Sequence, residues 1–466
     1  MSRHSIAVVC ALTALVSCAS PESKTAARLI EQARAGDGGW RKLAYLCDRI
    51  GPRLSGSAQL EQAVGWTAEE MARDGADRVW TERVMVPHWV RGIEKASIET
   101  PTAQPLAVAA LGGSIGTPPG GIRAEVIEVD SIDALKREGA KVAGRIVLYN
   151  RIMRRNGKRG EDYGAASPLR TTGAIEAAKL GAVATLVRSL GTADYRLVHT
   201  GAMRYEEGTP KIPAAAIAAE DAMLIHRLLE SEGSVTVRLE LGCGTLPEAE
   251  SANVLAEVQG RAAPGEVVLI GAHLDSWDLG TGAIDDGAGV VIVMESLRLL
   301  KTMEPRPRRT IRAVLFTNEE NGLRGGRGYA AAHKDEWPLH VAAIESDSGA
   351  GRPQGFSLSA GRGGEEMARG FGGLLAGIGA GRIWQGGGGA DIGPLSEGGV
   401  PLLGLRQDST YYFDYHHSPA DTLDKVDPEG LRLNVAAMSV MAWMLADTPI
   451  PLPRTDPSQP RPRRQR

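Results

Sequence analysis

The sequence predicts an α/β fold in which helices flank a mixed, mostly parallel sheet, with a smaller α/β domain inserted into it. From about Val254 onward, short apolar runs typical of buried strands alternate with helical segments, a pattern that specifies parallel strands covered on both faces. Between Pro101 and about Glu250 the pattern differs, which indicates a separate small domain. The 466 residues suffice for about three domains or for one large domain with an insertion.

The segment before the insertion is predicted to be mainly helical. Ser23–Ala35, Trp40–Arg49 and Glu61–Arg73 have helical patterns. The turns at residues 51–53 and 55–57, built from Gly, Pro and Ser, separate the second helix from the third. We therefore expect three helices before the inserted domain.

The inserted domain, residues 101–250, is predicted to contain three strands and two helices. They are the strands Arg145–Tyr149, Ala184–Val187 and Ile212–Ile217 and the helices Gly173–Leu180 and Glu220–Glu230. The remaining residues, 21–100 and 251–447, then form one larger domain that the insertion interrupts.

Three apolar runs supply the expected buried strands of the larger domain. They are Val267–Ile270, Ile311–Phe316 and Val341–Ile344. A helix over Ala288–Leu300 follows the first strand, and a helix over Leu431–Leu445 closes the domain. This alternation is what predicts a parallel arrangement.

Both ends of the chain have compositions of their own. The apolar run 5–16 is too short to span a bilayer and is typical of an export signal, so residues 1–20 are predicted to be a signal peptide. The run ends at Cys18 in a context that resembles the lipobox of bacterial lipoproteins, and both acylation of Cys18 and simple cleavage remain open. The mature protein is expected to be periplasmic, lipid-anchored or secreted. Residues 448–466, rich in Pro and Arg, are predicted to be disordered.

Charge and composition exclude some classes of partner. The net charge is −3 with 23% charged residues, so we expect no nucleic-acid partner. A membrane contact is expected only through a lipid on Cys18, and a homodimer is left open. Cys47 and Cys243 would meet an oxidising compartment, where they could pair, but the sequence does not decide this.

Candidate metal ligands follow each of the three buried strands. They are His273 and Asp275 after the first strand, Glu319 and Glu320 after the second, and Asp347 after the third. Two further segments, 278–286 and 415–417, add Asp285 and His417. Because open α/β sheets place their sites at the carboxyl ends of the strands, we expect these side chains to converge.

This mixture of imidazole and carboxylate ligands is typical of zinc. Asp285 could bridge two ions about 3.5–4 Å apart, the spacing of two-metal aminopeptidases. The adjacent Glu319 and Glu320 fit this chemistry, because one carboxylate is needed as a ligand and the other as a general base. Each motif taken singly has a structural interpretation; Asp286, for example, is a good N-cap for the helix that follows. Together the segments predict a site with two zinc ions per chain.

Five motifs resemble those of the co-catalytic di-zinc aminopeptidase and glutamate carboxypeptidase family. They are His273-Leu274-Asp275, Ala283–Gly287, Asn318-Glu319-Glu320, Ser346-Asp347-Ser348, and His417-Ser418 with Asp421-Thr422. The resemblance covers nearly all of residues 23–447. It implies the zinc-peptidase fold, which is phosphorylase/hydrolase-like, with an inserted segment similar to a protease-associated domain covering the cleft.

The resemblance also implies a role for each matching residue. The implied ligands are His273, Asp285 and Asp347 for one zinc ion, and Asp285, Glu320 and His417 for the other. Glu319 is implied as the general base and Asp275 as the residue that orients His273. A cis peptide bond between Asp285 and Asp286 is expected as well.

Two further residues are tentative substrate contacts. Glutamate carboxypeptidases have a Tyr before the last His ligand, where this chain has His416, and a His donor could also stabilise an oxyanion. Asp391, in the glycine-rich segment 386–393, could bind the free amine of a substrate. A turn-stabilising role for Asp391 is the alternative.

The function predicted from these observations is a zinc-dependent exopeptidase that hydrolyses dipeptides or short peptides. An aminopeptidase acting on longer peptides is an alternative, because the di-zinc core does not fix which terminus is read. A catalytically inactive binding protein and a single-zinc acyl transferase that cyclises N-terminal Gln are further alternatives. The complete five-ligand set and Glu319 favour the two-zinc peptidase.

Overall fold

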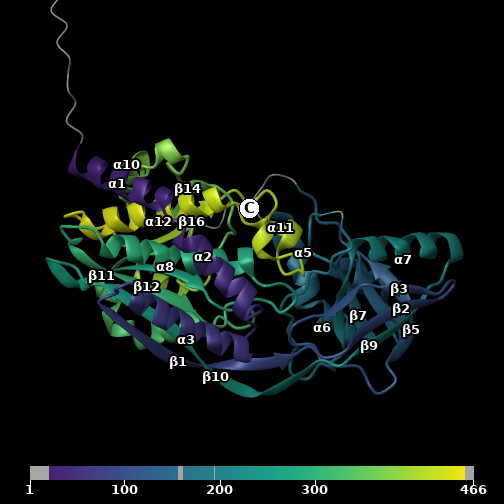
Figure 1. Cartoon of the computed structure of the whole chain (residues 1–466). Helices are drawn as coiled ribbons and strands as arrows, with labels where there is room; N and C mark the ends of the chain where they lie inside the picture. The colour runs from purple at the N-terminus through teal and green to yellow at the C-terminus, as the bar shows by residue number, and fades with distance from the viewer. Residues whose placement is uncertain (1–19, 156–160, 194, 457–466) are drawn as a thin grey trace, which may run out of the picture.

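The chain folds into two lobes, each built on a mixed eight-stranded sheet (Figure 1). The structure, a computed structural model, describes residues 20–155, 161–193 and 195–456. Nearly all of the expected signal peptide, Cys18 included, lies outside these ranges.

The larger lobe contains the first sheet, in the order β1-β10-β12-β11-β13-β16-β14-β15. Its strands are β1 (Arg78–Val90), β10 (Gly244–Val258), β11 (Ala263–His273), β12 (Arg309–Phe316), β13 (His340–Glu345), β14 (Pro353–Ser359), β15 (Arg382–Gln385) and β16 (Leu402–Gln407). The central strands β12, β11, β13 and β16 are parallel, whereas β1 pairs with β10, β10 with β12, and β14 with β16 in antiparallel fashion. The predicted mixed α/β fold is confirmed.

Helices cover both faces of this sheet. On one face lie α1 (Pro21–Ala35), α2 (Gly38–Tyr45), α3 (Ala58–Arg73), α8 (Ala288–Lys301), α10 (Gly364–Gly373) and α12 (Pro428–Asp447). On the other face, α9 (Arg324–Ala332) and the short turn Gly393–Gly398 pack against Phe316 and Val314 of β12. Further short helical turns are Leu46–Ile50, Lys334–Leu339, Ala376–Ile378 and Leu423–Lys425, and Ala283–Gly287 is a turn in which the backbone of Asp285 and Asp286 is not helical. The core thus fills two layers, one on each side of the sheet.

Several helices begin where the sequence supplies an N-cap. The side chain of Ser20 accepts a hydrogen bond from the backbone N–H of Ser23 at the start of α1, and that of Ser57 accepts one from Leu60 at the start of α3. The expected single helix Trp40–Arg49 differs from the structure, because the α-helix ends at Tyr45 and a wider π-helical turn continues to Ile50.

The smaller lobe contains the second sheet, in the order β3-β2-β9-β5-β6-β7-β8-β4. Its strands are β2 (Glu94–Thr100), β3 (Gln104–Leu106), β4 (Val108–Ala110), β5 (Ile122–Val129), β6 (Ile146–Tyr149), β7 (Ala184–Arg188), β8 (Ala214–Ile217) and β9 (Thr236–Leu241). Its helical segments are α4 (Ile132–Glu138), Gly139–Val142, α5 (Glu161–Thr171), α6 (Gly173–Lys179) and α7 (Ala219–Glu232). Apolar clusters line both faces of this sheet as well.

The border between the lobes lies before the expected residue 101. Strand β2, at 94–100, pairs with β3 and β9 of the smaller lobe. Strands β1 and β10 pair as far as Val90 and Gly244, in the sheet of the larger lobe. We therefore propose that the inserted lobe comprises residues 91–243 instead of 101–250. The change in sequence pattern near Pro101 marks the turn between β2 and β3.

The beginning of the C-terminal tail is packed against the larger lobe, contrary to the expected disorder of 448–466. Leu452 is buried, and the guanidinium of Arg454 donates hydrogen bonds to the carbonyl oxygens of Trp337, His340 and Gly398 at 2.7–2.9 Å. Composition could not reveal these contacts, because they depend on one side chain: a single Arg carries several N–H donors, which here bind the carbonyl oxygens of loops distant in the sequence. Residues 457–466 lie outside the described part of the chain.

Cys47 and Cys243 do not form a disulfide. Both thiols are free and buried, Cys47 in the core of the larger lobe and Cys243 in a core of the smaller one.

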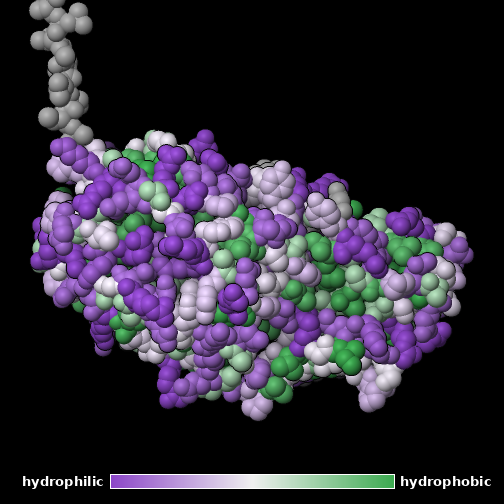
Figure 2. All heavy atoms as spheres, in the orientation of Figure 1, coloured by the Kyte–Doolittle hydropathy of each residue, from purple (hydrophilic) through white to green (hydrophobic). Residues whose placement is uncertain are grey.

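Across the described ranges, no helix has the length and apolar character needed to cross a membrane. The face in Figure 2 is mainly hydrophilic over the larger lobe, and hydrophobic residues gather on the smaller lobe.

Candidate metal centre

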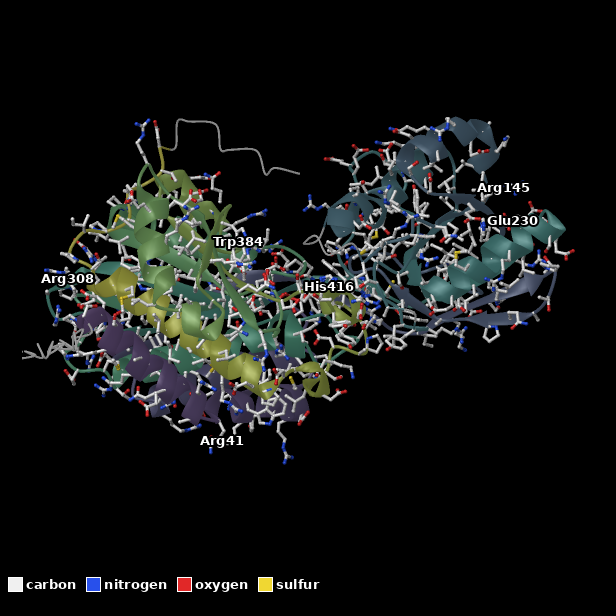
Figure 3. The ribbon with its side chains drawn as sticks, turned by 90° about the horizontal axis from the view of Figure 1, so that it is seen from above. Arg41, Arg145, Glu230, Arg308, Trp384 and His416 are labelled. Atoms are coloured by element: carbon white, nitrogen blue, oxygen red, sulfur yellow. The ribbon has the colours of Figure 1, made fainter. Side chains whose placement is uncertain are left out.

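The carboxyl ends of three neighbouring parallel strands bring the predicted ligands together. His273 is the last residue of β11, Glu319 and Glu320 follow β12, and Asp347 follows β13. These strands are adjacent in the order β12-β11-β13, so their ends meet at one edge of the sheet. The site lies where the larger lobe meets the smaller one: seen from above, His416 is at the junction of the lobes (Figure 3).

Asp285 occupies the centre of the site. Its Oδ1 lies 3.2 Å from Nε2 of His273, and its Oδ2 lies 3.3 Å from Nε2 of His417. The carboxylate is buried at the turn that precedes α8, and the peptide bond between Asp285 and Asp286 is cis, as expected. A carboxylate held in this way between two imidazoles would be able to bridge two metal ions.

The outer ligands stand on either side of Asp285. Nε2 of His273 is 3.8 Å from Oδ1 of Asp347, and Nε2 of His417 is 3.0 Å from Oε2 of Glu320. The other oxygen of Glu320, Oε1, is buried without a hydrogen-bond partner among the described residues. A buried carboxylate oxygen without a partner is expensive unless a cation binds it. The donor set therefore fits zinc.

Two groups of potential ligand atoms within 4.8 Å of one another occur in the described residues. The first, His273, Asp285 and Asp347, is the set expected for one ion. The second contains His416 together with Asp285 and His417, whereas Glu320 was expected there. His416 thus lies closer to the second metal position than the sequence indicated, and Glu320 approaches it from the side of His417.

The charges at the centre favour an ionised Asp285. Burial would raise the pKa of this carboxyl, but hydrogen bonds with His273 and His417 hold it well below its usual range. Burial lowers the pKa of His416, and the neighbouring His417 lowers it further. His416 is therefore a neutral imidazole.

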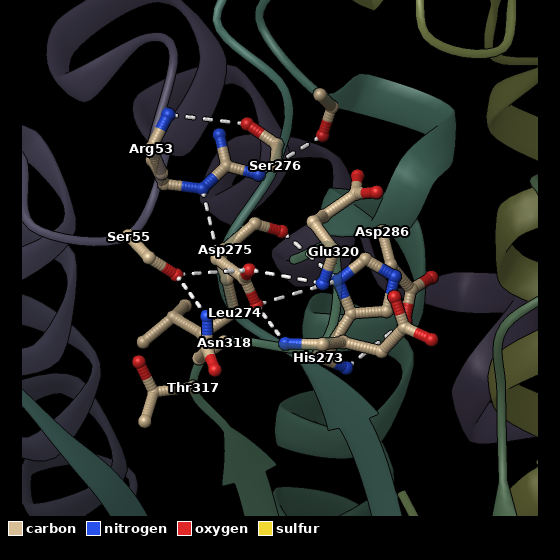
Figure 4. Close-up of polar contacts among 12 residues, drawn as sticks. Arg53, Ser55, His273, Leu274, Asp275, Ser276, Asp286, Thr317, Asn318 and Glu320 are labelled. Carbon is tan, nitrogen blue, oxygen red and sulfur yellow. Dashed lines mark hydrogen bonds and ion pairs between the residues drawn. The ribbon is translucent and has the colours of Figure 1, made fainter. Parts of the chain in front are cut away.

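Asp275 organises the site mainly through backbone groups (Figure 4). Its carboxylate accepts hydrogen bonds from the backbone N–H groups of Glu319 and Glu320, at 2.9 and 3.2 Å. Its carbonyl oxygen lies 3.0 Å from Nδ1 of His273, whereas its Oδ1 is 3.8 Å away. Asp275 thus contacts His273, as expected, chiefly through its backbone carbonyl, and it fixes both glutamates at the same time.

Arg53 and Ser55 support the same loops, and the sequence analysis assigned them no role. The fully buried guanidinium of Arg53 donates to the carbonyl oxygens of Leu274, Thr281 and Gly282, which flank the ligands in the chain. Ser55 donates to Asp275 at 3.4 Å. The sequence offers little indication of this role, because both residues lie in turns interpreted only as breaks between helices.

Glu319 lies beside the candidate ligands but belongs to neither of the two groups of potential ligand atoms. Burial raises the pKa of its carboxyl well above the usual range, and the negative charges of Asp347 and Glu320 add to this effect. A carboxylate with raised basicity next to a metal centre is suited to accept a proton.

The two tentative residues also lie at the site. Nε2 of His416 is 3.4 Å from Oδ2 of Asp285, and its ring stacks on that of His417 with centroids 3.5 Å apart. Asp391 is almost fully buried, and neither of its carboxylate oxygens has a hydrogen-bond partner among the described residues. Burial raises the pKa of Asp391, and the nearby Glu345 and Glu319 raise it further. These unsatisfied oxygens disfavour the turn-stabilising alternative.

The smaller lobe contributes a buried cation that the sequence analysis did not single out. Arg170 of α5 is 7% exposed, and its Nε has no partner within the described part of the chain. Its Nη1 donates to the carbonyl of Thr200 at 3.4 Å, and its guanidinium lies over the ring of Tyr163. Tyr163 in turn meets the ring of His416 edge-on at 5.2 Å. No carboxylate among the described residues forms an ion pair with Arg170.

Comparison with known proteins adds sequence relatives along nearly the whole chain. The model of peptidase family M28 matches residues 253–442. Mouse carboxypeptidase Q is 39% identical over 416 residues, which are 89% of this chain and 87% of that protein. Human carboxypeptidase Q is 38% identical over 437 residues, 93% of this chain and 90% of that protein.

Solved structures share the fold. A peptidase M28 precursor from Shewanella amazonensis superposes with a TM-score of 0.90 at 42% identity, covering 95% of this chain and 99% of that one. A zinc aminopeptidase from Bacillus subtilis reaches a TM-score of 0.63 at 18% identity, covering 87% of this chain and 93% of that one. At that identity the second likeness shows the fold alone.

Proposed function

The chain belongs to peptidase family M28 and is a zinc-dependent exopeptidase, and on that premise we propose that it is a dipeptidase whose site reads both ends of its substrate. The observation that carries the catalytic part is Asp285, with one carboxylate oxygen near His273 and the other near His417. We propose His273, Asp285 and Asp347 as ligands of one zinc ion, and Asp285, Glu320 and His417 as ligands of the other.

The reaction is hydrolysis of a peptide bond. When bound, two zinc ions would polarise the scissile carbonyl and make a water molecule nucleophilic near neutral pH. Glu319 accepts the proton of the attacking water and transfers it to the leaving amine. Because Asp275 holds the backbone N–H groups of Glu319 and Glu320, the base keeps a fixed position relative to the neighbouring ligand.

We propose that His416 stabilises the oxyanion. Its neutral ring has one nitrogen, Nε2, near Asp285, and the other, Nδ1, is buried without a partner among the described residues. A neutral imidazole has a single N–H; in the tautomer that carries it on Nδ1, this N–H is free to donate a hydrogen bond to the negative charge that develops on the substrate oxygen. We assign His416 this role, and its position among the ligand atoms makes a weak metal contact the alternative.

Two buried side chains, Arg170 and Asp391, suggest what the site recognises. Among the described residues Arg170 has no carboxylate partner, and a guanidinium in such surroundings binds the carboxylate at the C-terminus of a substrate. Both carboxylate oxygens of Asp391 lack a hydrogen-bond partner within the described part of the chain, and a carboxylate there binds the ammonium group at the N-terminus. A site that holds both termini accepts a dipeptide and excludes longer chains.

Replacement of Glu319 by Gln tests the catalytic assignment. Glu319→Gln is expected to keep two zinc ions per chain, because the ligands are intact, and to lower kcat by about 10²- to 10⁴-fold, because the base is lost. Zinc content by elemental analysis and dipeptide hydrolysis measure the two effects. Activity close to that of the wild type would exclude Glu319 as the base.

Replacement of Arg170 tests whether the site recognises the C-terminus of the substrate. The wild type is expected to cleave a dipeptide with a free carboxylate with a kcat/KM about 10- to 100-fold higher than that for the same dipeptide amide. Arg170→Gln is expected to remove this preference and to cleave the amide as the wild type does. Equal cleavage of acid and amide by the wild type would exclude a carboxylate site.

The alternatives give different results in the same assays. An aminopeptidase acting on longer peptides would cleave them as well as dipeptides, whereas the proposed dipeptidase would cleave dipeptides alone. A binding protein would hold zinc and cleave nothing. A glutaminyl-cyclising acyl transferase would bind one zinc ion per chain; the bridging position of Asp285 favours two.

We propose, in addition, that the protein is exported. The support is the apolar run 5–16 followed by Cys18. Mass spectrometry of the N-terminal peptide of the mature protein distinguishes a lipid on Cys18, which would anchor the chain in a membrane, from simple cleavage and release. Sedimentation equilibrium tests the homodimer.

A further inference from the structure

The two histidine ligands have the same hydrogen-bond pattern. In each, Nε2 faces the carboxylates of the site, and Nδ1 faces a backbone carbonyl: that of Asp275, at 3.0 Å, for His273, and that of Thr200, at 3.3 Å, for His417. Because a carbonyl only accepts, Nδ1 carries the hydrogen in both rings, which leaves Nε2 free to bind a metal ion. Each ligand therefore depends on one carbonyl for its tautomer and its orientation.

These two carbonyls come from different lobes. Asp275 is two residues from His273 in the same loop, whereas Thr200 belongs to the inserted lobe and is 217 residues away from His417 in the chain. The histidine of one metal position is thus oriented by a carbonyl of the larger lobe itself. The other needs the inserted lobe to hold its histidine.

The inserted lobe also fixes the backbone around His417. The N–H of Thr200 donates to the carbonyl of His417 at 2.9 Å, and Nδ1 of His199 donates to the carbonyl of His416 at 2.7 Å. The backbone N–H of Thr192 donates to the carbonyl of Phe413 at 3.0 Å. His417 has a φ of 59°, a conformation that residues other than glycine seldom adopt unless their surroundings enforce it. Figure 1 shows α11 (Tyr412–Tyr415), which leads into His417, close to α5 of the inserted lobe.

His199 and Thr200 are themselves firmly held. The Oγ1 of Thr200 donates to the carbonyl of Ala110 in β4, at 2.9 Å. The N–H of His199 donates to Oγ of Ser189 at 3.0 Å, which in turn donates to the carbonyl of Ile217 in β8. The His199 ring packs so closely on Gly191 that a Cβ there would lie 2.4 Å from its Nε2. The pair is a rigid extension of the inserted sheet.

We propose that His199 and Thr200 are positioning residues that set the zinc affinity of the His417 position and leave the His273 position unaffected. The inserted lobe thereby controls the second metal ion. This inference rests on the proposed function, because it assumes that His417 is a zinc ligand. Neither residue touches the substrate in this proposal.

A matched pair of variants at His199 tests the proposal. His199→Leu removes the donor to the His416 carbonyl, whereas His199→Asn places an amide N–H where Nδ1 stands. We measure the two zinc dissociation constants of the full chain by competition with a chromophoric chelator. His199→Leu is expected to weaken the second constant by about 10- to 100-fold and leave the first within about twofold, and His199→Asn to retain most of the affinity.

A third variant controls for general destabilisation. His340→Leu replaces another buried histidine, at the start of β13, and is expected to lower the thermal stability of the metal-free protein without changing either zinc constant. Equal weakening of both zinc constants by His199→Leu, or no weakening of either, would overturn the inference. Failure of the wild type to bind two zinc ions would instead overturn the proposed function.

Discussion

His340 links stability to pH at a position away from the metal centre. Its Nδ1 donates to the carbonyl of Glu336 at 2.9 Å, and its Nε2 accepts from the hydroxyl of Tyr329 at 2.8 Å. Burial lowers the pKa of His340 from its ordinary value of 6.5 to about 4. The folded state therefore holds this ring neutral at a pH where the unfolded chain protonates it.

The sign of the effect follows from this difference. The unfolded state binds the extra proton between pH 6.5 and about 4, so the contribution of His340 is complete above pH 6.5 and is lost as the pH falls toward 4. The loss approaches about 1.4 kcal/mol per pH unit. We expect His340→Asn to be less stable than the wild type near neutral pH and to show a shallower loss on acidification.

Urea unfolding of both proteins at several pH values, with a chelator present to remove metal, measures this difference. Comparison of the two proteins cancels the contributions of other groups that titrate in the same range, such as His199. Parallel pH dependences for wild type and variant would show that His340 does not titrate as inferred.

At the scale of the element, the start of α12 has a strong N-cap. The carboxylate of Asp427 accepts hydrogen bonds from the backbone N–H groups of Glu429 and Gly430, both at 3.1 Å, and Pro428 occupies the first helical position. We expect Asp427→Ala to lower the free energy of unfolding by about 1 kcal/mol. Asp424→Ala, at an exposed carboxylate that caps no α-helix, is the control, and chemical denaturation measures both.

Most elements, and the convergence of most candidate ligands, could be predicted from the sequence because they depend on local patterns. The three buried runs became β11, β12 and β13, and their polar successors, such as His273 and Asp347, meet at one sheet edge. The fold class is confirmed. The roles of the individual site residues remain proposals that the geometry supports.

The features that escaped prediction depend on contacts between distant segments. Arg170 and Thr200 reach the site only because the inserted lobe packs against the larger lobe there, and no local pattern encodes that contact. Arg53 is similar, since a turn residue gives no sign that its guanidinium will be buried under Leu274. Sequence periodicity places strands and helices, but it does not reveal which side chain crosses between lobes.

At the scale of the whole molecule, the start of the tail holds together parts of the larger lobe. Arg454 bridges the carbonyls of Trp337 and Gly398, and Leu452 is buried. We expect removal of residues 449–466 to lower the free energy of unfolding by about 3 kcal/mol, the sum of one buried side chain and a few hydrogen bonds to a charged group.

Removal of residues 457–466 alone is the matched control and is expected to leave the stability nearly unchanged. Thermal or urea unfolding of the two truncated chains gives the comparison. If both truncations had the same effect, the contacts of Arg454 and Leu452 would contribute nothing to stability.

The pairing of β1 with β10 has a consequence for how the molecule is assembled. The last paired residues are Val90 and Gly244, and the backbone N–H of Gly242 donates to the carbonyl of Ile93 just beyond them. In topological terms the two strands are a single β-hairpin, and the whole inserted lobe is its loop. A two-residue turn such as Asn-Gly could close the same hairpin. The larger lobe could therefore exist without the smaller one. Such a simpler protein would keep the sheet but lack the hydrogen bond from the inserted lobe that orients His417.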